Sequence, residues 1–195
     1  SPDFAVGGSG TNLLYGGGNG SYLFAGAGNS TLVGGTGNNT IMYGNTGSTN
    51  FVGSASGHDI MVGGSGSNTF SMTDGDVAFG GTTAGDTFNM GTGSALIVQG
   101  TANDSVVFGG GTATAFAGLG TDTYTVFKGL GGDVSLIGFK ASDHIALAGG
   151  FTAANAASAV AGATRGAFGT TLNLTDGTTI NVFGVSVSAS QISLG

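Results

Sequence analysis

A glycine-rich repeat of about nine residues runs through the first two thirds of the chain. Thirteen consecutive units align, from GGSGTNLLY (7–15) to AGLGTDTYT (117–125), and the slips in spacing are to eight or ten residues. Each unit reads as a tight turn followed by a short strand. A unit this small cannot bury a hydrophobic face alone, so stacked neighbours must share one core. The repeat therefore predicts a solenoid.

The middle residue of each short strand is expected to point inward. Two units make one coil, which gives roughly six to seven coils and a length of about 30 Å at ~4.8 Å per coil. The fold class that we predict is all-β, a right-handed parallel β-roll or β-solenoid with a small β-rich cap. The expected inward positions are Leu14, Leu23, Leu32, Ile41, Phe51, Met61, Phe70, Ala78, Phe88, Ile97, Val107, Phe116 and Tyr124.

Composition excludes several other classes. Glycine accounts for 43 of 195 residues, but 39% of the chain is apolar and the mean hydropathy is +0.30, which is unlike a disordered segment. Lysine and arginine number 3 against 10 acidic residues, so nucleic acid is not an expected partner. There is no cysteine, and no apolar run reaches the ~18 residues of a transmembrane helix.

The segment GLGTDTYTV (118–126) is close to the pattern G-G-x-G-x-D-x-U-x. On this basis the array 3–125 resembles the RTX (repeats-in-toxin, haemolysin-type) β-roll. The segments 134–151 and 171–186 are similar to the region that follows the repeats in secreted RTX proteins. The resemblance implies a secreted, extracellular protein exported by type I secretion. We accordingly divide the chain into a β-roll (1–125) and a C-terminal capping or secretion-type region (126–195).

In RTX rolls the sixth residue of the repeat is a calcium-binding Asp. Alternate units share an edge. One edge is expected to carry Asp3, Ser21, Asn39, Asp59, Asp76, Ala95 and Thr114, and the other Asn12, Ser30, Thr49, Asn68, Asp86, Ser105 and Asp122. Most of these residues are neutral and supply too little charge for calcium.

The best calcium site predicted from these columns is the successive pair Asp59 and Asp76. A weaker candidate is Asp86 with Asp104, which lies one residue out of register, or with Asp122. The alternative is that these residues only cap turns, as Asp and Asn commonly do. Where the ion is missing, Asn, Ser and Thr side chains are expected to hydrogen-bond to the turn backbone.

A second apolar pattern occupies outward positions of one sheet. Such a stripe is not needed for the core, so it predicts either self-association into a homo-oligomer or fibre, another partner, or cover by the tail of the same chain. The expected interaction face comprises Phe4, Tyr22, Phe24, Met42, Ile60, Val62, Val77, Phe79, Leu96 and Val98.

The other sheet is expected to present Thr31, Thr69, Thr87 and Thr123, in a ladder interrupted by Asn50 and Val106. That ladder motivates a hypothesis of ice or glycan binding, with cell-surface contact as one form of it. In the tail, the Ala-rich segment 152–168 predicts a short helix. The segment 171–183 predicts a hairpin that turns at Asp176-Gly177.

Catalytic motifs find little support in the sequence. His58 and His144 are the histidines, there is no Glu for paired-carboxylate chemistry, and no G-x-S-x-G motif occurs. We therefore expect a non-enzymatic structural or adhesive module, of the kind found in surface layers or biofilm matrix, largely independent of calcium. One alternative is the calcium-dependent folding and secretion module of a larger RTX enzyme or toxin. The other is an ice- or glycan-binding solenoid.

Overall fold

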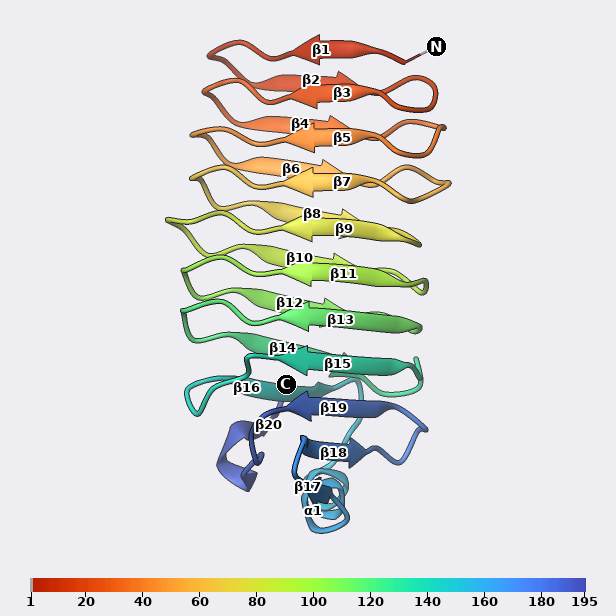
Figure 1. Cartoon of the computed structure of the whole chain (residues 1–195), viewed down its shortest axis with the longest axis vertical. Helices are drawn as coiled ribbons and strands as arrows, with labels where there is room; N and C mark the ends of the chain where they lie inside the picture. Colours follow the sequence, from red (N-terminus) through yellow and green to blue (C-terminus); the bar gives the residue numbers. More distant parts are fainter. Residues whose placement is uncertain (1) are drawn as a thin grey trace.

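The computed structural model describes residues 2–195 and is a parallel β-solenoid of about eight turns (Figure 1). Odd-numbered strands stack into one sheet, which β18 also joins, and the other even-numbered strands stack into the second sheet. Along the roll the chain alternates between the two sheets from strand to strand, with two strands to a coil. The solenoid and its all-β class are confirmed. The repeat array supplies β1 to β14, which is the upper end of the expected six to seven coils, and strands beyond residue 125 extend both sheets further.

The first sheet has eleven strands, and all pairs up to β19 are parallel. In spatial order its members are β1 (Phe4–Val6), β3 (Tyr22–Phe24), β5 (Ile41–Tyr43), β7 (Ile60–Val62), β9 (Asp76–Phe79), β11 (Ala95–Val98), β13 (Thr112–Phe116), β15 (Asp133–Ile137), β19 (Thr179–Phe183), β18 (Gly169–Asn173) and β17 (Thr164–Gly166).

The second sheet has nine parallel strands. They are β2 (Asn12–Tyr15), β4 (Ser30–Val33), β6 (Thr49–Val52), β8 (Thr69–Met72), β10 (Thr87–Met90), β12 (Ser105–Phe108), β14 (Thr123–Phe127), β16 (His144–Ala148) and β20 (Ile192–Leu194).

Glycine is required where the turns of successive coils stack. A Cβ on Gly26 would lie 1.6 Å from the carbonyl oxygen of Gly8, and one on Gly57 would lie 1.7 Å from that of Asp74. Gly57 also has a φ of 69°, which L residues rarely adopt. The high glycine content thus follows from close backbone packing at the two edges of the roll.

The core lies between the two sheets, and each strand except β17 contributes at least one side chain to it. Phe51, Phe70 and Phe88 stack on successive coils, with ring centroids 4.7 and 4.6 Å apart and interplanar angles of 2° and 5°. All three are fully buried. Their spacing matches the distance between parallel strands, so identical residues at equivalent positions stack face to face.

The register differs from the sequence prediction by one residue at three places. In β5 the inward residue is Met42, which pairs with Leu23 and is 0% exposed, so placing Met42 on the interaction face was wrong. Asn39 has a φ of 60° and adds a residue to the preceding turn, which moves Thr40 into the edge column.

The other two shifts lie in β12 and β13. Val106 and Phe108 point inward while Val107 does not, so Asp104 and not Ser105 occupies the edge column. In β13 Ala115 is buried and Phe116 is exposed, which places Ala113 and not Thr114 beside Ala95.

The C-terminal region continues the roll and then closes its end. Strands β15, β16, β19 and β20 extend the two sheets. Beyond these strands in space, at the bottom of Figure 1, lie α1 (Ala153–Ala161), η1 (Ala189–Gln191), β17 and β18. The predicted hairpin is confirmed, and the predicted helix is confirmed over Ala153–Ala161, whereas Thr164–Gly166 of the same segment form β17. Thr152 caps α1 through reciprocal hydrogen bonds with Asn155, and β18 pairs with β19 in antiparallel fashion.

Candidate interaction face and aspartate ladders

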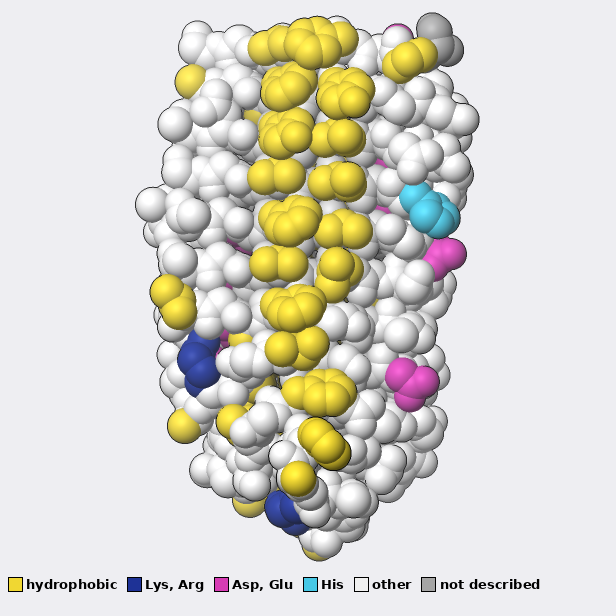
Figure 2. Space-filling model, viewed as in Figure 1, with side chains coloured by type: hydrophobic (Ala, Val, Ile, Leu, Met, Phe, Trp, Pro, Cys, Tyr) yellow, Lys and Arg dark blue, Asp and Glu magenta, His cyan; other side chains and the backbone are white. Residues whose placement is uncertain are grey.

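The outer face of the odd-numbered sheet carries two apolar columns, which we call the apolar stripe. Figure 2 shows them running straight along the roll, the right-hand column shorter than the left-hand one. The strand register aligns the first column as Phe4, Tyr22, Ile41, Ile60, Val77 and Leu96, and the second as Val6, Phe24, Tyr43, Val62, Phe79, Val98, Phe116, Ile137 and Phe183.

Nine of the ten residues predicted for the interaction face lie in this stripe, Met42 being the exception. The structure adds six residues to those nine: Val6, Ile41, Tyr43, Phe116, Ile137 and Phe183. Ile41, Tyr43 and Phe116 follow from the register shifts in β5 and β13. Ile137 and Phe183 lie in strands of the tail, where the nine-residue spacing no longer applies, and Val6 pairs with Phe24 at the N-terminal end.

The tail of the chain does not cover the stripe. Phe79 and Phe116, near its middle and its lower half, are 38% and 39% exposed, and α1 lies at the end of the roll and not across its face (Figure 1). Intramolecular cover, the alternative left open by the sequence, is therefore not what this fold provides. Several hundred square ångströms of contiguous apolar surface are typical of an interaction site.

Ring stacking organises the N-terminal end of the stripe. The rings of Phe24 and Tyr43 stack with centroids 5.0 Å apart and an interplanar angle of 7°, and Phe4 contacts Phe24 at 5.4 Å. From Val62 onward, aliphatic and aromatic residues alternate in the second column. The column thus presents large and small side chains in turn, on strands whose backbone hydrogen bonds fix their spacing.

The outer face of the even-numbered sheet is polar along one column. The register aligns Thr31, Asn50, Thr69, Thr87, Ser105 and Thr123 on successive strands. Val106, which the sequence prediction placed in this column, is buried in the core and so does not interrupt it. A shallow groove beside the ladder is lined by Thr31, Asn50 and Thr69 with neighbouring turn residues.

Aspartates line the edge of the even-numbered sheet, in what we call the aspartate ladder: Asp86, Asp104, Asp122 and Asp143. Oδ1 of each accepts a hydrogen bond from a backbone amide one coil earlier. The amides of Asp86, Asp104 and Asp122 lie 2.8, 3.0 and 3.0 Å from the next carboxylate. Oδ2 closes the residue's own turn, as when the Gly100 amide donates to Asp104 over 2.9 Å. Each carboxylate therefore joins two coils.

The edge of the odd-numbered sheet holds a shorter version of the same arrangement. The amide of Asp59 donates to Oδ1 of Asp76 over 2.8 Å, and the amide of Thr40 donates to Oδ1 of Asp59 over 2.7 Å. The second oxygens accept from the turn amides of Ser54 and Thr73. The predicted pair Asp59 and Asp76 is thus brought together, with both carboxylates fully buried.

Burial controls the electrostatics of the aspartate ladder. Desolvation raises the pKa of Asp104 to about 6 and also raises the pKa values of Asp86, Asp122 and Asp76, even though backbone hydrogen bonds oppose these shifts. Neighbouring carboxylates in the ladder contribute to the raised pKa of Asp104. Successive buried carboxylates therefore disfavour full ionisation of the ladder.

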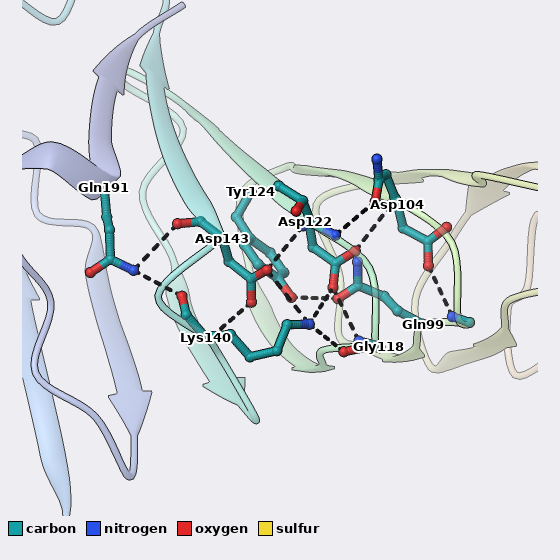
Figure 3. A network of polar contacts seen from close by, with 11 residues as sticks. Gln99, Asp104, Gly118, Asp122, Tyr124, Lys140, Asp143 and Gln191 are labelled. Carbon is teal, nitrogen blue, oxygen red and sulfur yellow. Dashed lines mark hydrogen bonds and ion pairs between the residues drawn. The ribbon is translucent and has the colours of Figure 1, made fainter.

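Lys140 supplies a positive charge at the C-terminal end of the ladder (Figure 3). Its Nζ lies 3.7 Å from Oδ2 of Asp122 and 3.6 Å from Oδ1 of Asp143, and it donates to the carbonyl oxygen of Gly118. Gln191 donates to the carbonyl oxygens of Lys140 and Asp143, which ties the last coil to the cap. This ammonium group partly offsets the two carboxylates.

The oxygens of the aspartate side chains are engaged in hydrogen bonds in this arrangement. Calcium takes six to eight oxygen ligands, whereas the oxygens of these carboxylates already accept backbone hydrogen bonds. Within residues 2–195 no group of three or more Asp, Glu, His or Cys side chains is placed to hold a metal. Calcium at Asp59 and Asp76, or at Asp86, Asp104 and Asp122, stays a prediction for titration to test.

The two histidines lie apart from each other. His58 sits in a turn with a φ of 63°, and its Nδ1 lies 3.4 Å from the carbonyl oxygen of Ser56. His144 begins β16 and is exposed. In the described part of the chain no helix is long and apolar enough to cross a membrane.

Comparison with known proteins leaves the family open. No model of a protein family matches the chain, and a search of curated proteins finds no significant match. The parallel solenoid is compatible with an RTX-like β-roll. The class defined by the fold is accordingly a β-solenoid repeat protein.

Proposed function

We propose that this chain is a non-catalytic structural or adhesive module of the extracellular space, a divergent RTX-type roll that self-associates through the apolar stripe. The observation that carries the proposal is the exposure of that stripe along the whole roll. A sheet whose inner face already forms the core gains nothing in the monomer from a second apolar face. Association with another surface would remove it from water.

The aspartate ladders support a fold that is largely independent of calcium. Turns of successive coils are joined by hydrogen bonds from backbone amides to side-chain oxygens, with a carboxylate at Asp104 and a neutral amide at Asn68. Because the neutral residue makes the same inter-coil bond, a metal ion is not needed to close that turn. The secreted location is inferred from the RTX resemblance.

The test of self-association is sedimentation across a concentration series, with a matched pair of variants. Phe79→Ser removes an aromatic residue that is 38% exposed from the centre of the stripe. Phe127→Ser removes one of similar exposure, 40%, from β14 in the other sheet. Burying a half-exposed Phe from each of two copies is worth roughly 2–4 kcal/mol, so Phe79→Ser should weaken association at least tenfold. Phe127→Ser should leave it unchanged. A wild-type chain that stays monomeric at millimolar concentration would contradict the proposal.

A second candidate, ice or glycan binding, is favoured by the unbroken polar ladder on the even-numbered sheet. Its hydroxyl and amide groups repeat at the strand spacing of ~4.8 Å on a parallel sheet. The substitution Thr69→Val would remove a central hydroxyl group with little change in volume. If the wild-type protein shows neither thermal hysteresis nor binding on a glycan array, this candidate is excluded.

The third candidate, a calcium-dependent secretion module, is suggested by the RTX resemblance. This candidate requires that the chain fold only after calcium binds. A chain that folds fully in a chelator would count against it, whereas calcium-triggered folding would favour it over the structural module.

A further inference from the structure

We propose that the apolar stripe pairs with the stripe of a second copy about a two-fold axis parallel to the long axis of the roll. Equal coils of the two copies then face each other, with the first column of one copy opposite the second column of the other. This inference rests on the proposed self-association and adds the partner's orientation. It makes the assembly a closed dimer and not an open fibre, because a two-fold axis through this face uses the face completely.

The area of the stripe matches what a specific dimer needs. At roughly 40 to 50 Å² per partly exposed side chain, its fifteen residues offer about 700 Å² per copy, or on the order of 1,300 Å² when two copies pair, within the usual range for specific interfaces. The stripe is also straight (Figure 2), so two stripes can stay in contact along their whole length.

Charge favours a second copy over an anionic membrane surface. The stripe contains no charged residue, so pairing two copies brings no like charges together at its centre. The chain carries a net charge of −7 with only 3 basic residues, which gives anionic lipid headgroups little to attract them.

The taper of the stripe selects the parallel orientation. Its first column becomes polar at β13, β15 and β19, where Thr114, Ser135 and Asn181 replace apolar residues, while the second column stays apolar. The stripe is therefore two columns wide over β1 to β11 and one column wide below. A parallel pair lays the wide half of one copy on the wide half of the other.

An antiparallel pair would lay the polar residues of one copy over the wide half of the other, interrupting the apolar contact along most of its length. In the parallel pair those residues gather at one end, where water can reach them, as at the polar rim of an interface. The sizes of the facing side chains are also complementary at the centre of the stripe. Phe79 of one copy lies opposite Val77 of the second, and Leu96 lies opposite Val98.

The orientation is tested by spin labels on single introduced cysteines, which the absence of natural cysteine makes straightforward. Ser9, Ser65 and Leu119 are exposed and lie in turns on the same edge, three coils apart, away from the stripe. The variants are Ser9→Cys, Ser65→Cys and Leu119→Cys. Each is labelled separately, checked by circular dichroism for the wild-type spectrum, and measured by dipolar electron paramagnetic resonance.

The parallel dimer predicts that the three label-to-label distances agree within about one strand spacing, ~5 Å. An antiparallel dimer would make the distance at Ser9 longer than that at Ser65 by tens of ångströms, which overturns the orientation but keeps self-association. Absence of any dipolar signal, with a monomer in sedimentation, overturns both proposals. A monomer that floats with zwitterionic phosphatidylcholine vesicles would assign the stripe to lipid instead.

Discussion

The two halves of the even-numbered edge join successive coils with different chemistry. In the N-terminal half the column is neutral, with Asn12, Ser30, Thr49 and Asn68, and in the C-terminal half it is the aspartate ladder. The Thr49 amide donates to Oδ1 of Asn68 over 3.1 Å, and the Asp86 amide donates to Oδ1 of Asp104 over 2.8 Å. At Asn68 and Asp104 an oxygen acceptor, with or without charge, thus joins successive coils. The amides of Asn12 and Ser30 instead donate to backbone carbonyl oxygens of the next coil, and Oγ1 of Thr49 has no hydrogen-bond partner among the described residues.

The second polar atom shows how each turn adapts to its side chain. Nδ2 of Asn68 donates to the carbonyl oxygen of Gly66 over 2.8 Å, whereas Oδ2 of Asp104 accepts from the amide of Gly100 over 2.9 Å. A neutral residue is therefore matched to a turn that offers a carbonyl group, and a carboxylate to one that offers an N–H. The aspartate half also bears the cost of burying charge, which the neutral half avoids.

The largest effect is expected from removing a carboxylate of the ladder. Asp122→Ala leaves the amides of Asp104 and Gly118 without their acceptor and leaves Lys140 with one carboxylate partner fewer. We expect a loss of about 3–5 kcal/mol in the free energy of unfolding. Ser30→Ala, in the neutral half, breaks only bonds of 3.3 and 3.4 Å and should cost under about 1 kcal/mol. Urea unfolding measures both, and equal losses would contradict the comparison.

The second effect is a fall in stability as the pH rises. Because the native pKa of Asp104 is about 6 and the unfolded value is near ~3.9, the native state holds more protons in that range. Stability should be greatest at and below pH ~4 as far as this group is concerned, and should decrease through pH 6. With solvent screening allowed for, we expect a change of about 1–2 kcal/mol.

Asp104→Asn should flatten this pH dependence in thermal melts between pH 4 and pH 8. Asp74→Asn is the control, since Asp74 is exposed and its pKa is lowered by hydrogen bonds from Ser94, so it titrates below the window. If Asp104→Asn keeps the wild-type slope, the buried ladder is not the origin of the effect.

A smaller effect is expected from the counter-charge at the end of the ladder. Lys140→Met removes an ammonium group from between Asp122 and Asp143, and should cost about 1 kcal/mol at pH 8 and less at pH 5. Lys128→Met is the matched control, because Lys128 is exposed and its Nζ contacts the carbonyl oxygen of Gly150 at 3.4 Å. A loss that is the same at both pH values would argue for a packing role of Lys140.

The period of the repeat was enough to predict the solenoid, the two edges and most of the stripe. The predicted strand register was wrong where several neighbouring residues are apolar and the inward one cannot be singled out. Val106, Val107 and Phe108 are all apolar, so a nine-residue count could not show which of them point inward. The 18-residue distance between equivalent residues of one sheet would have decided it, because it places Asp104 midway between Asp86 and Asp122.

Other parts of the ladder were hidden by changes in spacing. Asp143 lies 21 residues after Asp122, beyond the regular array, and on the other edge the extra residue at Asn39 adopts a left-handed backbone conformation. Asn is among the few residues that adopt this conformation readily, so the pair Asn38-Asn39 was a usable signal. The cap could be predicted as a helix and a hairpin, but its strands join the roll through long-range pairing that no local pattern reveals.

The central claim is that hydrogen bonds, and not calcium, hold successive coils together. The most direct measurement is a circular-dichroism thermal melt of the wild-type chain in excess EDTA and in millimolar calcium. The account predicts a β-rich spectrum in both solutions, with midpoints that agree within about 2 °C, a shift worth at most about 1 kcal/mol for a chain of this size. A random-coil spectrum in EDTA that becomes β-rich on adding calcium would contradict it.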